Sequence, residues 1–444
     1  MATLAIAVAA FAFQQTAITP AIPTIEHELG ASQAWSAWLL SGYLLASAVF
    51  TPLLGKLADR FGKRRLLLGS LAVFLLGSVG AALAPSLVTL VAARFVQGAG
   101  GAVFPLALAI ARDELDPEAT RSGIGLLTGA FGAGTIAGFG LAGVITEAAS
   151  WRWVFGAGAG AVLLALVLAA MVVPRSPDRH EAPLDLPGAG LLAGGLALVL
   201  VALTEGPLAG WTSPFVLGAA VAGVALLAWW LAHDLRADAP LLDIRVLAAR
   251  PVLLTNGASA LVGYVLFGVF YLVPYLVEAP QRGYGFGAGP IDAGLYLLPA
   301  AVGQTIAGPL SGRLGRRHDP RWPFAGGMAM AAAGAAWLAL SHAEPWEVLA
   351  AVFLLGCGFG AAIGVASALV TQAAPTSESG IAAALNSVVR RVGGGFGGQI
   401  SAALLAGSAA GGAPPAEEAF VLAFAIAAGL ALTGTAMALA VRAT

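Results

Sequence analysis

The sequence predicts an all-α protein that crosses a lipid bilayer about fourteen times. Of its 444 residues, 59% are hydrophobic and only 10% are charged, whereas roughly 25% are charged in an ordinary soluble domain. A soluble fold could not cover its surface with so few charges. The chain also holds 59 glycines, which let helices approach closely in lipid, where apolar burial between helices contributes little.

Apolar runs of about 20 residues, enough to cross about 30 Å of hydrocarbon, lie between charged or Pro- and Gly-rich breaks. The run beside Met1 has no basic leader and no small-residue cleavage site, so we expect a retained span. The expected spans are 2–23, 36–56, 64–84, 87–110, 122–146, 152–173, 187–205, 213–233, 251–277, 289–311, 322–341, 346–372, 379–408 and 417–441.

Basic residues predict the orientation, because Lys and Arg resist translocation and collect on the cytoplasmic side. With the N-terminus inside, the outward connections hold only Arg152 and Arg282, and Arg94, Arg390 and Arg391 fall within spans. The rest of the 22 Lys and Arg lie on the inward side. We therefore expect a multi-pass protein of the plasma membrane (the bacterial inner membrane), with both termini cytoplasmic.

A short internal repeat relates two halves of the chain. Residues 52–57 close the second span and residues 309–314 close the tenth, each before a basic cluster. Two six-helix halves alone would place the second copy after the eighth span, so two extra helices are expected between them. The expected parts are an N-terminal six-helix bundle, two additional helices with flanking loops, and a C-terminal six-helix bundle, over 1–174, 175–250 and 251–444.

The connection after the second span, residues 55–65, resembles the signature loop of the major facilitator superfamily in its glycines, acid and bases at fixed offsets. Glycines permit close helix approach and a sharp turn, and the acid can pair with a base or accept from a helix N-terminus. The positive-inside rule alone would explain the bases but not the acid. The resemblance implies a latch at the cytoplasmic gate, formed by Gly55, Asp59, Arg60, Gly62 and Arg64.

Two further segments resemble motifs of the same superfamily. Residues 94–101 are similar to its buried-arginine motif, and Arg94 could bind an anion, tune a proton site or hold helices together through backbone carbonyls. Residues 134–143 are similar to its exporter-specific glycine motif, with Phe139 in place of the proline. Gly134 and Gly138 keep the small-xxx-small spacing, for a gating role or for ordinary helix packing.

Other segments extend the resemblance over nearly the whole chain to the fourteen-helix drug:proton antiporter branch of the superfamily. They are residues 151–155, 204–206 with 210–211, 240–243, 293–299 and 386–394. The resemblance implies the major facilitator fold, with two six-helix bundles plus two extra helices, and alternating access around a substrate site near the midplane.

The first span departs from that branch. Gln14 stands where the branch has an acid, and a glutamine can hydrogen-bond a substrate but takes up no proton near neutral pH. Proton coupling would then need another group. The candidates besides Arg94 are the acids nearest the expected cavity mouth, Glu26, Glu147 and Asp292, each of which could instead be an ordinary loop or helix-end acid.

Polar side chains within the spans are expected to face a central wet cavity, because unpaired amides are costly in hydrocarbon. Asn386 and Arg390 are four residues apart and so share a helix face. Each such residue could instead bond two helices together. The expected substrate-contacting residues are Gln14, Gln97, Asn256, Tyr264, Tyr296, Gln304, Asn386 and Arg390.

Together these features predict a secondary active transporter that exports a small amphipathic compound or drug in exchange for protons. Arginines without acids inside the spans favour neutral or anionic cargo over dications. The alternatives are an uncoupled facilitator, a translocator of lipid-like or anionic substrates, and a transport-inactive receptor or scaffold.

An enzyme is not expected, because the spans hold no constellation of His, Asp and Glu for metal or acid–base chemistry. For the same reason we expect no cofactor and no metal site, and nothing in the sequence indicates a nucleic acid partner. The expected partners are the small-molecule substrate, protons and membrane lipid, and the chain is expected to act as a monomer.

Overall fold

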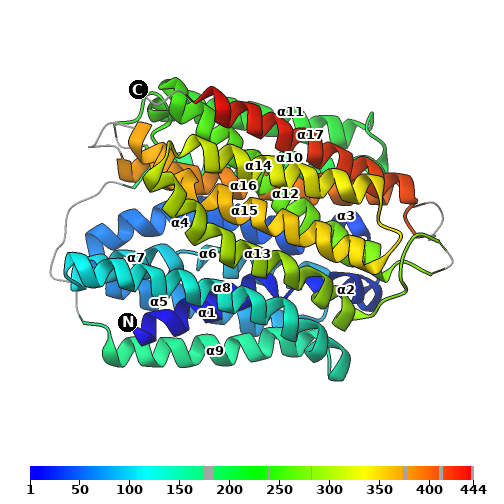
Figure 1. Cartoon of the computed structure of the whole chain (residues 1–444), viewed down its shortest axis with the longest axis horizontal. Helices are drawn as coiled ribbons and strands as arrows, with labels where there is room; N and C mark the ends of the chain where they lie inside the picture. The colour runs from blue at the N-terminus through cyan, green and yellow to red at the C-terminus, as the bar shows by residue number, and fades with distance from the viewer. Residues whose placement is uncertain (175–183, 239, 282, 374–378, 410–413, 442–444) are drawn as a thin grey trace.

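Long helices that lie roughly side by side make up the computed structural model of the chain (Figure 1). It describes residues 1–174, 184–238, 240–281, 283–373, 379–409 and 414–441, and no strand occurs among them. The start of α1 and the end of α17 lie at the same end of the molecule, which we call the terminal end; α2 and α3 lie at the opposite end (Figure 1).

The first helices form what we call the N-terminal group. Its first rod is interrupted near Pro20 and Pro23, because a proline has no backbone N–H to continue the helical ladder. The elements are α1 (Ala2–Thr16), η1 (Thr19–Ala21), α2 (Ile22–Leu29), α3 (Gln33–Ser36), α4 (Trp38–Phe61), α5 (Lys63–Ala82), α6 (Leu87–Ala99), α7 (Val103–Glu114), α8 (Pro117–Ala148) and α9 (Trp151–Val172).

The inserted pair and the C-terminal group follow. The inserted pair is α10 (Leu186–Ala209) and α11 (Pro214–Asp234), and a short turn, η2 (Ile244–Ala248), leads from it to the C-terminal group. That group consists of α12 (Arg250–Glu278), α13 (Pro290–Arg317), α14 (Arg321–Leu340), α15 (Pro345–Ala373), α16 (Ser379–Ser408) and α17 (Glu417–Ala440).

Every span expected from the sequence is largely helical, which confirms the all-α fold, although 2–23 and 87–110 are each interrupted by a short turn. Twelve helical segments within the described residues are long and apolar enough to cross a membrane. Two further helices, α13 and α16, are equally long but more polar: α13 holds Gln304 and a basic last turn, and α16 holds Arg390 and Arg391. The count of fourteen spans therefore stays a prediction.

Helix ends differ from the sequence prediction most clearly after the second span. The expected connection began at Gly55, but α4 continues to Phe61, and the chain turns only at Gly62 before α5 begins at Lys63. Gly62 has a φ of 93°, a conformation that only glycine adopts without strain. Most of the residues expected to form a loop are thus the last turns of a helix.

The two groups meet along a seam formed mainly by two helix pairs. Within the N-terminal group, α1 packs on α8 and α9, and α6 packs on α4 and α5; within the C-terminal group, α12 packs on α16 and α17, and α13 packs on α15. The seam consists chiefly of α8 against α13 and α4 against α16. At the end opposite the termini, η1 and α2 also touch α12, and α3 touches α16; α10 touches both α4 and α16.

Small residues allow the close contact between α8 and α1. A Cβ atom at Gly134 would clash with the backbone oxygen of Ala9, and one at Gly138 would clash with the side chain of Thr16. Close backbone approach of this kind is the usual basis of helix association in lipid. The spacing noted in the sequence therefore lies in a packed interface inside the N-terminal group.

Replacing Gly134 with alanine should push α8 away from α1. We expect a loss of about 1–3 kcal/mol of stability, the usual cost of overpacking a tight interface, seen as a lower thermal unfolding midpoint in detergent. The matched control is Gly125→Ala on the same helix, where an added Cβ meets no heavy atom within 4 Å. Equal midpoints for the two variants would contradict the packing described here.

Candidate functional site

Arg94 is fully buried among α4, α5 and α6. Its Nε donates to the carbonyl oxygen of Leu39 at 2.8 Å, and its Nη1 donates to Oε1 of Gln97 at 2.7 Å. The guanidinium also lies over the ring of Tyr43, 4.5 Å from the centroid, and Gln97 donates in turn to Ser78 at 2.9 Å. Arg94 and Gln97 thus bind three helices of the N-terminal group together, and Nη2 of Arg94 is left without a partner.

Gln14 lies apart from this network, between α1 and α9. Its Nε2 donates to the carbonyl oxygen of Phe155 at 3.1 Å, and its buried Oε1 has no partner. The absence of a Cβ at Gly158 makes room for the glutamine side chain. In this conformation Gln14 therefore contacts α9 of its own group and not the seam.

A second polar network joins α12 to α16 in the C-terminal group. The Nδ2 of Asn386 donates to Ser259 Oγ at 2.7 Å and to Asn256 Oδ1 at 3.3 Å, and Arg390 Nη1 donates to Asn386 Oδ1 at 3.3 Å. Asn256 and Asn386 are buried, whereas Arg390 is only partly buried. The structure thus brings together three of the residues selected from the sequence.

The other selected residues of this group lie on α12 and α13. Tyr264 is buried, and Gly397 of α16 packs against its backbone. Tyr296 is partly exposed and stacks on Phe286, with ring centroids 5.6 Å apart. Gln304 is partly buried and lies next to Thr305, which contacts Gly132 of α8 across the seam.

Two residues that sequence reasoning did not select cross the seam between α16 and α4. Arg391 Nη1 donates to the carbonyl oxygen of Ser47 at 3.2 Å and to Oγ1 of Thr51 at 2.6 Å. Gln399 accepts from Ser41 Oγ at 3.1 Å. The signal that could have found both is the one used for Arg390, a polar side chain inside an apolar run.

Gln399 also connects the inserted pair to both groups. Its Nε2 donates to the carbonyl oxygen of Ala34 at 2.9 Å and to Oγ1 of Thr204 on α10 at 2.8 Å. The same Thr204 oxygen accepts from Trp38 Nε1 of α4 at 2.8 Å and donates to Leu200 O at 2.8 Å. One hydroxyl group therefore meets α4, α10 and α16.

The three acids expected to couple protons all lie toward the end opposite the termini. Glu147 is exposed near the end of α8, close to Gly289, and Asp292 is exposed in the first turn of α13. An acid in that position interacts favourably with the helix dipole. Glu26 differs from both, because it is partly buried and accepts a hydrogen bond from the Tyr275 hydroxyl across the seam.

The residues of the expected latch lie at the terminal end. Asp59 and Arg60 are exposed on the last turns of α4, and the Arg60 guanidinium lies 5.3 Å from the ring centroid of Phe61. Arg64 donates to the carbonyl oxygen of Ala170 on α9 at 2.5 Å. These contacts stay within the N-terminal group. Gly55 is not tightly packed, because a Cβ atom added there would meet no heavy atom within 4 Å.

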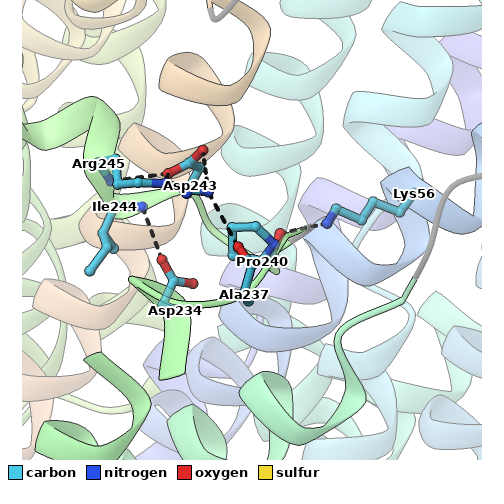
Figure 2. Close-up of polar contacts among 7 residues, drawn as sticks. All are labelled: Lys56, Asp234, Ala237, Pro240, Asp243, Ile244 and Arg245. Carbon is cyan, nitrogen blue, oxygen red and sulfur yellow. Dashed lines mark hydrogen bonds and ion pairs between the residues drawn. The ribbon is translucent and has the colours of Figure 1, made fainter. Parts of the chain in front are cut away.

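Lys56, next to Gly55, reaches out of its group. Its Nζ donates to the carbonyl oxygen of Pro240 at 2.5 Å (Figure 2). Pro240 begins a segment between α11 and α12, residues 240–246, which we call the strap. Its backbone is fixed by two aspartates: Leu241 N donates to Asp185 at 3.2 Å, and Ile244 N donates to Asp234 at 3.1 Å.

The strap also has an apolar side that faces both groups. Leu241 and Leu242 are buried in one cluster with Leu53 of α4 and with Leu385 and Val388 of α16. Within the strap, Asp243 forms an ion pair with Arg245 at 2.8 Å (Figure 2). The hydrogen bond of Arg245 with Asp243 lowers the pKa of this carboxyl.

Comparison with known proteins agrees with this architecture. Helices in two groups that meet along a seam, with an apolar exterior, define a multi-pass membrane protein built as two bundles. The chain superposes on the crystal structure of a peptide transporter, POT, in complex with sulfate, with a TM-score of 0.72 at 16% sequence identity. The superposition includes 99% of this chain and 93% of the peptide transporter.

A family model described as the Major Facilitator Superfamily matches residues 4–398 and 300–443. The chain therefore belongs to the Major Facilitator Superfamily, a family of membrane transporters and not of enzymes, as the motifs predicted.

Among its relatives, a multidrug resistance protein B homolog of Mycobacterium tuberculosis is 32% identical over 395 residues, which are 86% of this chain and 71% of the relative. A tetracenomycin C resistance and export protein of Streptomyces glaucescens is 31% identical, over 89% of this chain and 73% of the relative. A puromycin resistance protein of Streptomyces alboniger is 32% identical, over 86% and 76%.

We expect Asp185→Ala to release the strap and uncap α10, because Asp185 accepts from Leu241 N and from Gly188 N. The free energy of unfolding should fall by about 1–3 kcal/mol at neutral pH, which is followed as a lower thermal unfolding midpoint. Burial raises the pKa of Asp185, but hydrogen bonds from His233, Gly188 and Leu241 lower it by more, so that it lies below 3.8.

The pH dependence of that difference follows from the lowered pKa. A carboxyl whose pKa is lower in the folded than in the unfolded protein stabilises the fold at pH values above its unfolded-state pKa. This stabilisation disappears as the pH falls through the folded-state pKa. The midpoints of the wild type and Asp185→Ala should therefore converge below about pH 4. Asp243→Ala, whose bonds go to Arg245 two residues away, is the control and should change the midpoint less; an equal change in both variants would contradict the role of Asp185.

Proposed function

We propose that this transporter exports small amphipathic compounds, such as antibiotics, by alternating access and in exchange for protons. The names of its relatives support the cargo class, since three of them are called multidrug, tetracenomycin C or puromycin resistance proteins. Both termini would lie in the cytoplasm, so that the end opposite the termini faces outward.

The observation that supports alternating access best is the uneven contact along the seam. Near the opposite end, Gly143 packs on the backbone of Pro290, and Gly294 packs on the backbone of Phe139. Farther toward the terminal end of α8, a Cβ added at Gly125 or Gly129 would meet no heavy atom within 4 Å. Contact at one end of α8 and space at the other fit a carrier that receives its cargo from the cytoplasm.

Exposure narrows the choice of residues that contact the cargo. Gln14, Gln97, Asn256, Asn386 and Tyr264 are buried in helix packing. Three of the selected residues keep accessible atoms: Arg390, Tyr296 and Gln304. We infer that these three contact the cargo, while the buried amides hold Arg390 and its helix in place. A guanidinium in this position favours neutral or anionic compounds, because a buried cation would need a counter-charge.

Purified protein in liposomes tests this function. With tetracenomycin C as the cargo, an imposed pH gradient should accelerate its transport, and Arg390→Ala should slow it by about 10-fold or more, the cost of losing one charge-assisted hydrogen bond. Arg236→Ala, an exposed arginine after α11, removes the same charge and should leave the rate unchanged.

Each other outcome of this experiment contradicts part of the proposal. Equal transport with and without the pH gradient would remove the exchange with protons and favour a facilitator, the alternative that Gln14 suggests. No transport of tetracenomycin C or of any compound in a panel of neutral and anionic drugs would favour a receptor or scaffold. Equal rates for Arg390→Ala and the wild type would remove Arg390 from the cargo site.

A further inference from the structure

A chain of hydroxyl groups closes the seam at the end opposite the termini. The Tyr275 hydroxyl of α12 donates to the carboxylate of Glu26 on α2. The Tyr271 hydroxyl lies 3.3 Å from that of Tyr275 and donates to the carbonyl oxygen of Gln33 at 2.7 Å. These bonds join the N-terminal group directly to the C-terminal group, so the closed state of this end depends on them.

A second carboxyl, Glu278, lies three residues after Tyr275 and so on the same side of α12. Its Oε1 is buried and has no hydrogen-bond partner. Tyr275, one helical turn earlier, holds the Glu26 carboxylate against the same side of α12. An ionised carboxylate without a partner is costly away from water, and two neighbouring carboxylates cannot both ionise without repulsion.

Neither Glu26 nor Glu278 forms an ion pair with a basic side chain in the part of the chain that the structure describes. The elements packed most closely on α2 are η1, α3 and α12. Of these, η1 and α3 hold no titratable side chain, and α12 contributes Tyr271, Tyr275 and Glu278. On α2 itself, His27 is exposed, and Glu28 faces α9, where it pairs with Arg152 at 3.6 Å and accepts from Trp151.

We propose that Glu26 and Glu278 share one proton, that this proton keeps the end opposite the termini closed, and that its loss to the solution on that side opens this end. With the proton, the pair carries a single charge, which the Tyr275 hydroxyl stabilises. Without it, two like charges face each other across the seam, and α2 separates from α12 until water reaches both carboxylates.

This inference rests on the proposed alternating access but not on a particular cargo. It adds a proton site that the sequence did not reveal, because Glu278 draws attention only once it is seen beside Glu26. It also places the site at a gate, where acidity outside controls how readily the carrier closes. Such control is separate from the acid that Gln14 replaces in the first span.

Distances between spin labels test the proposal without any transport assay. Labels are attached at Ala31→Cys and Gly283→Cys, which flank the seam at this end, in the full chain with Cys357→Ser in lipid nanodiscs. Cys357 is the only native cysteine. The wild-type pair should give a short distance in acid and a growing long component as the pH rises. A distance that does not change with pH would overturn the proposal.

Three variants assign the response to this pair. Glu26→Gln with Glu278→Gln should keep the short distance at every pH, because neither side chain can ionise. Tyr275→Phe should move the opening midpoint to lower pH by about one unit, since the lost hydrogen bond stabilised the closed, singly charged state. Glu28→Gln, two residues from Glu26, is the matched control and should open as the wild type does.

The outcomes separate this proposal from the proposed function. An opening that follows pH in a protein that transports none of the compounds would leave the proton site in place and remove drug export. Drug transport by the wild type, together with an opening that follows pH equally in the wild type and the double variant, would leave drug export in place and remove the proton site. Each variant is first checked for a single elution peak and wild-type helix content, and if the double variant fails, Glu278→Gln alone must still shorten the distance at high pH.

Discussion

Lipid offers no hydrogen bonds, so every polar side chain inside the helices of this transporter must find its partner on another part of the protein. This constraint organises the whole molecule. Arg94 and Gln97 gather α4, α5 and α6, and Asn386 with Asn256 ties α12 to α16. Each network lies within one group, so that in the proposed alternating access each group would move as a unit, and the bonds across the seam are the ones that a change of conformation would exchange.

The overall fold was predictable from the sequence because it depends on features that can be recognised within short stretches of the chain. Apolar length, Pro- and Gly-rich breaks and basic clusters mark the helices one at a time, without knowledge of their neighbours. The residues at which the helices end were less predictable. Residues 55–61 look like a connection because they are charged, yet they continue α4, since a helix can extend beyond the apolar region with its charges exposed.

The partners of polar residues could not be predicted, because a sequence shows that a side chain is polar but not which neighbour satisfies it. Gln14 and Arg390 looked equivalent as polar residues within spans. The structure separates them: Gln14 bonds to the backbone of α9, whereas Arg390 keeps accessible atoms. Glu278 was hidden for a related reason, since its environment depends on Glu26, more than two hundred residues away along the chain.

Thr204 shows what the inserted helices contribute to such a molecule. Its oxygen accepts from Trp38 of one group and from Gln399 of the other, while its proton goes to its own helix. With both lone pairs engaged by opposite groups, no relative displacement of α4 and α16 can leave α10 unaffected. In the proposed alternating access, the added helices would therefore be mechanically coupled to the relative motion of the two bundles through a single side chain.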